Sequence, residues 1–341
     1  MRYLGTLFLI GATAISSPAL SQQTMYVAGY GGSFQKEMEA NIIPEFEAKH
    51  NVKIVYVPGI SSETVAKLQA QRGHEQINVA IIDDGPMYQA IHYGDCDSLE
   101  SAPVYEDIYD FARFGGNAIG IGLNATGIVY NKEVFKKNGW SPPTSWQDLT
   151  DKKYAQHFTT SSISGTYGVD TLVVFARING GSEKNIQPGF DVIREKLAPS
   201  VVSWSSSPAQ IAEMFENGDI DIAVWGSNRA IPLKDGGFPV EFVYPKEGAV
   251  ALVAAACVVV QNSAPELSQA FVQYLVSPEV QVKLATQGFG PANRMTRLND
   301  KLAAALPYGP EKIAKMMSVD WPVINQHRAE WTGEWNRTIE K

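Results

Sequence analysis

The residues of this sequence that could do chemistry stand directly after its predicted strands. Five clusters combine an aromatic or acidic side chain with Gly or Ser: Tyr30–Ser33, Asp83–Tyr88, Ser164–Gly168, Trp204–Ser207 and Trp225–Asn228. The free N–H groups at the start of the helices that follow, together with serine hydroxyls, can bind the negative end of a ligand. Tyr and Trp rings can stack on an apolar stem or hold a cation against the ring face. The clusters therefore indicate binding of a small molecule.

A second interpretation of these clusters stays open, because Gly, Ser and Asp after a strand are also ordinary turn and cap residues. Trp204 and Trp225 are the harder pair to explain in this way, since each ends a predicted strand beside serines. A buried indole N–H normally needs a partner, and a ligand cleft can supply one.

Patterns for catalysis and for metal binding are missing. The five histidines are scattered without the spacing of metal ligands, and Asp83-Asp84 is equally well explained as a helix cap. Cys96 lies in a polar loop, whereas Cys257 lies in an apolar strand, so we favour two free thiols over a disulfide. The sequence predicts no catalytic residue, no metal site, no cofactor and no enzymatic activity.

Strands and helices alternate along the chain, and the early strands are apolar and uninterrupted. This pattern predicts an α/β fold with mainly parallel sheets covered by helices on both faces. Ligands of open α/β sheets bind beyond the carboxyl ends of the strands, which is where the five clusters lie. The expected elements include a strand over 127–131, an apolar strand over 250–260 and a C-terminal helix over 322–339, in which Trp331 and Trp335 face the core together with Trp321.

Length and charge narrow the class of protein. The 341 residues suggest two domains, and 36 acidic against 28 basic residues, without a basic cluster, argue against nucleic acid as a partner. Residues 1–21 show a positive start, an apolar stretch and small residues before a cleavage point after Ser21. They predict a signal peptide and export to the periplasm.

The order of several weak motifs resembles the extracellular solute-binding proteins of bacterial ABC importers, in the family that includes the spermidine/putrescine-binding proteins. The resemblance rests on Tyr30–Ser33, Val79–Asp84, Gly127–Asn131, Pro143–Leu149, Phe271–Glu279, Gly288–Pro291 and Trp331–Asn336. It implies a two-lobed periplasmic-binding-protein fold (type II) with a hinge of crossing strands. Lobe 1 would hold residues 22–121 and 251–341, and lobe 2 residues 122–250. The implied mechanism is hinge closure on a small solute by a monomer that delivers it to an inner-membrane permease.

The ligand expected from this resemblance is a small amine, an amino-acid-like molecule or a polyamine-type solute. Polyamine binders hold ammonium groups with carboxylates, whereas the segment Ser164–Gly168 is neutral here and Ser227 stands where that family has an acid. This departure favours a ligand with a single positive end. The predicted ligand-binding residues are Tyr30, Gly31, Ser33, Asp83, Asp84, Tyr88, Thr166, Tyr167, Trp204, Ser205, Trp225, Ser227 and Glu247.

Three alternatives share this fold. A thiaminase-like transferase would use a cysteine nucleophile, but neither Cys96 nor Cys257 falls in a strand-end cluster. A metal- or anion-binding importer protein is the second alternative, although the adjacent tyrosines of ferric-ion binders are absent. A partner of a chemosensory receptor is the third.

Overall fold

A computed structural model describes residues 22–340 of the chain, and the predicted signal peptide lies outside them. One mixed sheet runs through the molecule in the order β2-β1-β3-β10-β5-β8-β6-β7, with β4 and β9 paired to β5. The strands are β1 (Gln23–Tyr30), β2 (Val52–Gly59), β3 (Val79–Asp83), β4 (Arg113–Phe114), β5 (Ala118–Asn131), β6 (Phe158–Ser161), β7 (Val201–Ser205), β8 (Ile222–Gly226), β9 (Val240–Val243) and β10 (Val250–Val258).

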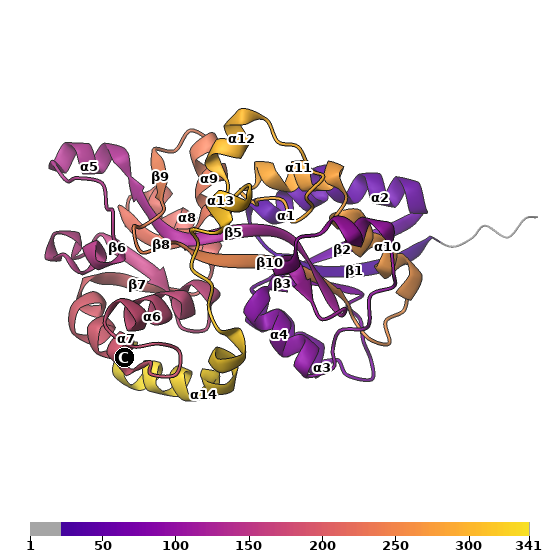
Figure 1. Ribbon diagram of the computed structural model, residues 1–341, viewed down its shortest axis with the longest axis horizontal. Coiled ribbons are helices and arrows are strands. Elements are labelled where there is room, and N and C mark those ends of the chain that lie inside the picture. Colours follow the sequence, from indigo (N-terminus) through magenta and orange to yellow (C-terminus); the bar gives the residue numbers. More distant parts are fainter. Residues whose placement is uncertain (1–21, 341) are drawn as a thin grey trace, which may run out of the picture.

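The sheet has two parallel parts joined by antiparallel strands. Strand β1 pairs in parallel with β2 and β3, and β6 pairs in parallel with β7 and β8. Between them β5 and β10 pair antiparallel to each other and cross from one half of the molecule to the other (Figure 1). The predicted α/β fold of the type II periplasmic binding proteins is confirmed.

Two separate hydrophobic cores define the two lobes. The core of lobe 1 is built from residues 25–123 and 253–292, and the core of lobe 2 from residues 128–252 and 321–339. Helices cover lobe 1 as α1 (Ser33–Glu37), α2 (Ile43–His50), α3 (Ser61–Ala70), α4 (Asp84–His92), α10 (Pro265–Leu275) and α11 (Pro278–Thr286). Lobe 2 carries α5 (Lys132–Asn138), α6 (Thr166–Ile178), α7 (Gln187–Val192), α8 (Pro208–Asn217), α9 (Ser227–Asp235) and α14 (Trp321–Thr338). The connection before α14 holds α12 (Asp300–Ala305) and α13 (Pro310–Ile313).

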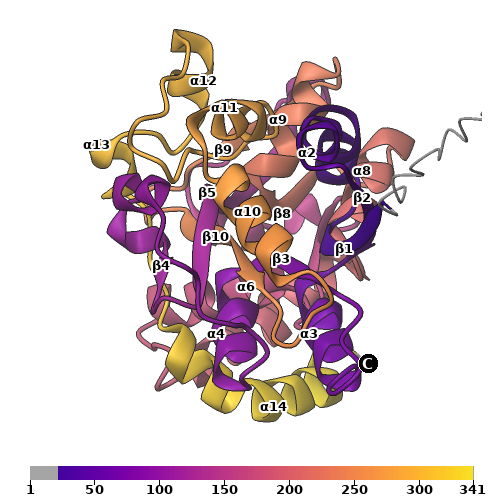
Figure 2. The same cartoon turned by 90° about the vertical axis from the view of Figure 1, so that its right-hand side faces the viewer.

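The C-terminal helix packs into the core of lobe 2, whereas the prediction placed it in lobe 1 with the rest of 251–341; core residues 253–292 do lie in lobe 1. Trp321, Trp331 and Trp335 are buried in the core of lobe 2, as their spacing predicted for a core position. In Figure 2, α14 lies beneath α3 and α4, and Asn325 on α14 donates to the Gly85 carbonyl of α4 at 2.9 Å. An apolar helix face shows that a helix packs, but not against which lobe.

Glycines let the crossing strands pack closely. A Cβ at Gly120 would stand 2.6 Å from the Cβ of Ala112, and one at Gly122 would stand 2.8 Å from the Cβ of Phe289. The whole of Ala118–Asn131 is therefore a buried strand, longer than the predicted strand over 127–131.

Cys96 and Cys257 form a disulfide, so the expectation of two free thiols is wrong. Cys96 forms an isolated antiparallel bridge with Val259, directly after β10, and this pairing brings its Cα to 5.7 Å from that of Cys257. The polar neighbours of Cys96 in sequence misled the prediction, because the side chain itself is buried. No thiol is left among residues 22–340 to act as the nucleophile of a transferase.

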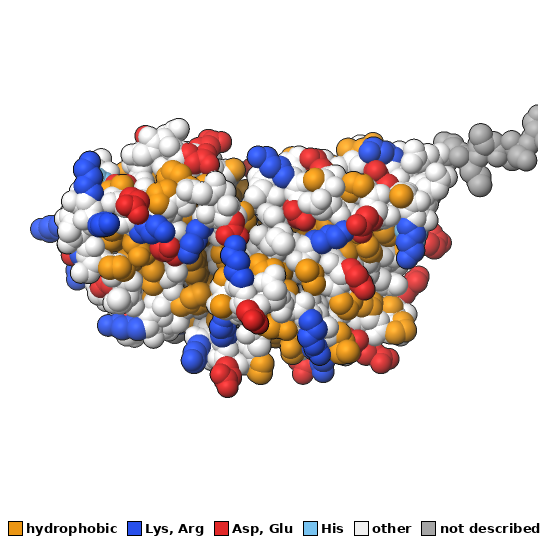
Figure 3. All heavy atoms as spheres, turned by 90° about the horizontal axis from the view of Figure 1, so that it is seen from above, with side chains coloured by type: hydrophobic (Ala, Val, Ile, Leu, Met, Phe, Trp, Pro, Cys, Tyr) orange, Lys and Arg blue, Asp and Glu red, His pale blue; other side chains and the backbone are white. Residues whose placement is uncertain are grey.

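Acidic and basic side chains are interspersed on the face seen in Figure 3, without a large patch of one sign. Within residues 22–340, no helix combines the length and the apolar character that a membrane span requires.

Candidate functional site

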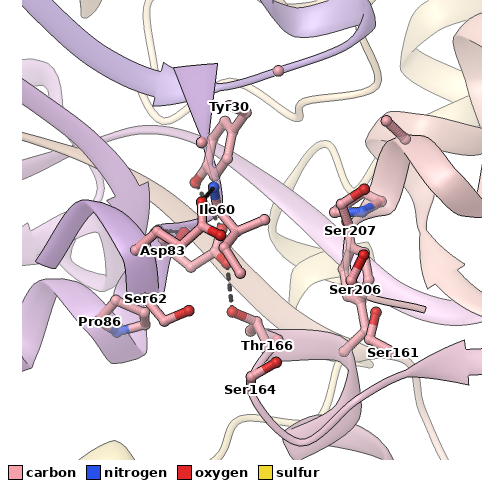
Figure 4. Close-up of a pocket in the computed structure, with 18 of the residues that line it drawn as sticks. Tyr30, Ile60, Ser62, Asp83, Pro86, Ser161, Ser164, Thr166, Ser206 and Ser207 are labelled. Carbon is pink, nitrogen blue, oxygen red and sulfur yellow. Dashed lines mark hydrogen bonds between the residues drawn. The ribbon is translucent and has the colours of Figure 1, made fainter. Parts of the chain in front are cut away.

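A pocket of about 330 Å³ lies between the two lobes, and both contribute to its wall. Figure 4 shows Tyr30, Ile60 and Asp83 of lobe 1 facing Thr166 and Ser207 of lobe 2. The other lining residues are Gly31, Pro58, Gly59, Ser61, Ser62, Glu63, Pro86, Ser161, Ser164, Gly165, Tyr167, Ser206, Pro208, Ala209, Asn228 and Arg229. The pocket thus lies at the carboxyl ends of β1, β2, β3 and β6, where ligands of open α/β sheets bind.

Two contacts hold the lobes together across this pocket. The Asp83 carboxylate accepts a hydrogen bond from the Tyr30 hydroxyl at 2.7 Å within lobe 1, and a second one from the Thr166 hydroxyl of lobe 2. Arg229 of lobe 2 donates from Nη1 to the carbonyl of Gly31 at 2.9 Å, and its guanidinium carbon lies 5.7 Å from the centre of the Tyr30 ring. The lobes are therefore closed around the pocket.

Helix N-termini converge on the pocket from both lobes. Its wall includes the first residues of α3, α6 and α8, which are helices of 10, 13 and 10 residues. The N-cap of α6 is Gly165, which offers no side chain to its free N–H groups, whereas Ser207 caps α8 by accepting from the Gln210 N–H. Free N–H groups and helix dipoles at such ends favour negative charge.

Hydroxyl groups and one guanidinium add further hydrogen-bond donors to the pocket wall. Ser62, Ser161 and Ser164 line the pocket, and their hydroxyls make no hydrogen bond with another residue among 22–340. Arg229 is 7% exposed, and no salt bridge pairs it with a carboxylate in the described part of the chain. A buried guanidinium of this kind binds carboxylates and phosphates with charge-assisted hydrogen bonds.

Two acidic residues, Asp83 and Glu63, also line the pocket and accept hydrogen bonds from the protein. Burial raises the pKa of Asp83, while its hydrogen bonds from Thr166 and Tyr30 and the charge of Arg229 oppose that rise. Burial, followed by the Asp83 charge, raises the pKa of the Tyr30 hydroxyl, so that it stays protonated and donates. Glu63 is exposed and accepts from the backbone N–H of Ile60 at 3.5 Å. Each carboxylate oxygen can accept more than one hydrogen bond, so Asp83 and Glu63 remain able to contact a cationic group as well.

Five of the predicted site residues line the pocket: Tyr30, Gly31, Asp83, Thr166 and Tyr167. Ser33 and Trp225 lie instead on a second, adjoining cavity. Trp225 is 1% exposed and packs against Phe215 in the core of lobe 2, with 6.0 Å between the ring centres. The pocket wall therefore contains no tryptophan.

The remaining predicted residues have structural contacts away from the pocket. Trp204 packs edge-on against Trp335, Ser205 donates to the Ser207 carbonyl, and Ser227 accepts from the Ala125 N–H. Asp84 is buried behind Asp83, where it accepts from the backbone N–H groups of Gly85 and Val253. Tyr88 lines a groove beside α14, and Glu247 accepts from Ser145 and Trp146 on the far side of lobe 2.

Most of the hydroxyl-bearing residues that line the interlobe pocket were not among the predicted ligand-binding residues. The missed residues are Ser61, Ser62, Ser161, Ser164, Ser206, Ser207, Asn228 and Arg229. Several of them stand within the strand-end clusters, one or two residues beyond the residue that was chosen. The start of the following helix was the signal that could have found them, because that is where the chain meets the cleft.

The described residues hold no group of three or more His, Cys, Asp or Glu side chains arranged to bind a metal ion. The pocket wall combines hydroxyl and amide groups with one buried guanidinium, Arg229, and two carboxylates, Asp83 and Glu63. Such a site can bind a small polar solute through several hydrogen bonds.

Comparison with solved structures places the fold among bacterial binding proteins. An ABC transporter structure from Clostridium perfringens is 24% identical, with a TM-score of 0.71, 92% of this chain covered and 99% of that one. The periplasmic binding protein AfuA from Actinobacillus pleuropneumoniae, solved with fructose-6-phosphate bound, is 20% identical, with a TM-score of 0.78 and coverage of 94% and 98%. MotA from A. tumefaciens, solved with glucopine, is 19% identical, with a TM-score of 0.75 and coverage of 92% and 98%.

Sequence comparison gives a curated relative and a family. An uncharacterized protein of Haemophilus influenzae is 28% identical over 214 residues, which span 60% of this chain and 59% of that protein. The family model for bacterial extracellular solute-binding proteins matches residues 41–307. Members of this family are binding proteins that act outside the cytoplasm and not enzymes, as the sequence predicted. The match does not assign the chain to the spermidine/putrescine-binding proteins that the sequence resembled. The chain therefore belongs to the bacterial extracellular solute-binding protein family.

Proposed function

We propose that the chain is the substrate-binding component of an ABC importer, and that it captures a small anionic solute in the interlobe pocket. The observation that carries the choice of an anion is the set of donors around the pocket. Helix N-termini from both lobes, serine hydroxyls without a partner among residues 22–340 and the buried Arg229 favour a negatively charged group, whereas Asp83 and Glu63 in the same wall oppose it.

Closure of the lobes supplies the transport signal in this proposal. The contacts of Asp83 with Thr166 and of Arg229 with Gly31 form only when the two lobes meet. A ligand held by both lobes adds further contacts to the closed form and shifts the equilibrium towards it. We infer that an inner-membrane permease recognises this closed form.

The small amine or amino-acid-like ligand expected from the sequence stays a prediction, with weaker support. It would pair its ammonium group with the exposed Glu63 or with Asp83, whose two oxygens already accept from Tyr30 and Thr166. Leaving a buried ammonium group partly unpaired would cost several kcal/mol. The same test compares both ligand classes.

The test is calorimetry of the mature protein with inorganic phosphate, phosphate esters, small carboxylates, amino acids and spermidine. We expect anions to bind and spermidine not to bind. Arg229→Gln should weaken anion binding roughly 10- to 100-fold, since a charged hydrogen bond contributes about 1.5–3 kcal/mol. Arg337→Gln on the exposed face of α14 is the matched control and should bind like the wild type. Tight binding of spermidine or of an amino acid cation, unaffected by Arg229→Gln, would refute the proposal.

A further inference from the structure

Three carboxyl groups lie together where the two lobes meet. Asp83 and Asp84 belong to lobe 1, and Asp170 on α6 belongs to lobe 2. Thr166 and Asp170 are four residues apart, so they share one face of α6. Because Thr166 donates to Asp83 across the interface, this face of α6 is turned towards lobe 1 (Figure 4). We call Asp83, Asp84 and Asp170 the acidic cluster, in which Asp84 and Asp170 are buried.

The two buried members of the acidic cluster are bound to the crossing strands. The Asp84 carboxyl accepts from the backbone N–H of Val253 on β10 at 3.4 Å, and the Asp170 carboxyl accepts from the Thr126 hydroxyl on β5 at 2.6 Å. Strands β5 and β10 are paired at this level, with Val250 opposite Thr126. An opening turn about these strands would therefore move Asp170 away from the two acids of lobe 1 and expose it to water.

Within residues 22–340, no cation forms a salt bridge with the acidic cluster. The two nearby arginines donate to backbone carbonyls: Arg229 on α9 to that of Gly31, and Arg328 on α14 to those of Ile163 and Ser164. The other titratable side chains that face the cluster are Tyr30, Tyr88 and Tyr167. Three ionised carboxyls would therefore repel one another across the closed interface.

The closed form favours protonated acids in this cluster. Oδ1 of Asp170 is buried without a hydrogen-bond partner among residues 22–340, which is costly for a charged oxygen. Burial, and after it the charges of Asp84 and Asp83, raises the pKa of Asp170 against the hydrogen bond from Thr126 and the charge of Arg328. When the lobes separate, Asp170 leaves the other two acids and meets water, so its pKa falls towards the ordinary value. The closed form therefore binds this proton more tightly than the open form.

We propose that protonation of the acidic cluster closes the two lobes, so that the protein holds its solute more tightly at acidic than at alkaline pH. The sign follows from proton binding, because the closed form carries the additional proton. Closure is favoured most below the pKa of the open form and is lost as the pH rises through that of the closed form. Between these values, one proton changes the ratio of closed to open protein about tenfold per pH unit. The role in solute capture rests on the proposed function.

The first experiment is small-angle scattering of the mature protein without ligand, between about pH 5 and pH 8.5. The proteins are the wild type, Asp170→Asn and Asp84→Asn, and each variant removes one titrating carboxyl from one lobe. Asp219→Asn is the control, because that carboxyl is exposed just after α8 and lines neither the interlobe pocket nor the cavity beside it. Circular dichroism at each pH shows that every protein remains folded.

We expect the radius of gyration of the wild type and of Asp219→Asn to increase as the pH rises, because the lobes separate. Asp170→Asn should lose most of this increase, and Asp84→Asn should lose part of it. The comparison is the change with pH within each protein, so a constant effect of a substitution on the structure cancels. The second experiment measures the dissociation constant of sulfate, whose charge is constant over this range. It should rise about tenfold or more from pH 5.5 to pH 8 for the wild type, and about twofold or less for Asp170→Asn.

The scattering experiment needs no ligand, so its outcome is separate from that of the proposed function. A wild-type radius that does not change with pH, or a full change in Asp170→Asn, refutes closure by protonation while anion binding can still hold. If the radius responds as expected but the sulfate affinity does not depend on pH, the link from closure to capture is refuted. If the radius responds and sulfate binds at no pH, closure by protonation is supported and the proposed anionic ligand loses support.

Discussion

The buried Asp84 carboxyl should make the stability of this protein fall as the pH rises. Asp84 begins α4 behind the pocket and is 7% exposed. Burial, followed by the negative charge of Asp83, raises its pKa from 3.8 to about 7. In the unfolded chain both causes are absent, so the carboxyl loses its proton near its ordinary pKa.

The sign of the effect follows from proton binding. Between about pH 4 and pH 7 the native state keeps the Asp84 proton and the unfolded state does not. The stabilisation is therefore complete below the unfolded pKa and is lost as the pH rises through the native pKa. A difference of roughly 3 pH units at 1.36 kcal/mol each gives an upper limit of about 4 kcal/mol. Burial raises the pKa of Asp83 and Asp170 as well, which acts in the same direction.

The assay is urea unfolding between pH 4.5 and 7.5, with Asp84→Asn as the comparison. The carboxamide has the shape of the protonated carboxyl and does not titrate. The amide nitrogen cannot accept from the Gly85 or Val253 N–H, so the variant carries a cost that does not depend on pH, and we expect it to gain about 2–4 kcal/mol relative to the wild type between pH 4.5 and pH 7.5. The difference between the two proteins isolates Asp84 from the other titrating groups. If that difference is constant across the range, or if the wild type gains stability relative to Asp84→Asn as the pH rises, the reasoning is refuted.

Three further predictions concern the disulfide and the contacts between the lobes. Replacing Cys96 and Cys257 together by Ala should lower the unfolding free energy by up to about 5 kcal/mol, because the disulfide closes a loop of 161 residues. Urea titration measures this change, and an unchanged unfolding midpoint would contradict it. Gly85→Ala should lower the melting temperature by several degrees, since its Cβ would stand 2.4 Å from the indole ring of Trp321 on α14. A melting temperature equal to that of the wild type would show that α4 and α14 can move apart without cost. Thr166→Val removes the hydroxyl that bridges the lobes, so small-angle scattering should give a larger radius of gyration for the unliganded protein. Thr166→Ser keeps the hydroxyl and should match the wild type. Identical scattering curves for all three proteins would exclude a role of this hydrogen bond in closure of the lobes.

The alternation of strands and helices was readable because apolar runs and cap residues are local signals. The carboxyl ends of the strands were also the right region to search, since Tyr30, Asp83 and Thr166 do line the pocket. Which of several neighbouring residues faces the pocket could not be predicted from the sequence. Trp225 and Arg229 are four residues apart, and the first packs largely into the core while the second lines the pocket. Which of them faces a ligand depends on where strand β8 ends and how α9 leaves it.

The class of fold and the order of its elements could be predicted from the sequence, because periodicity and strand-end composition are properties of short segments. Only the tertiary structure decided the pairing of Cys96 with Cys257 and the docking of α14 on lobe 2, since both depend on contacts between distant segments. It also decided the electrostatics of the pocket. From the sequence alone, Asp83 is an acidic residue without known partners. In the structure its carboxylate joins the two lobes by accepting hydrogen bonds from Tyr30 and Thr166. Helix ends and Arg229 leave donors facing the cleft, and these support the proposal of an anionic ligand.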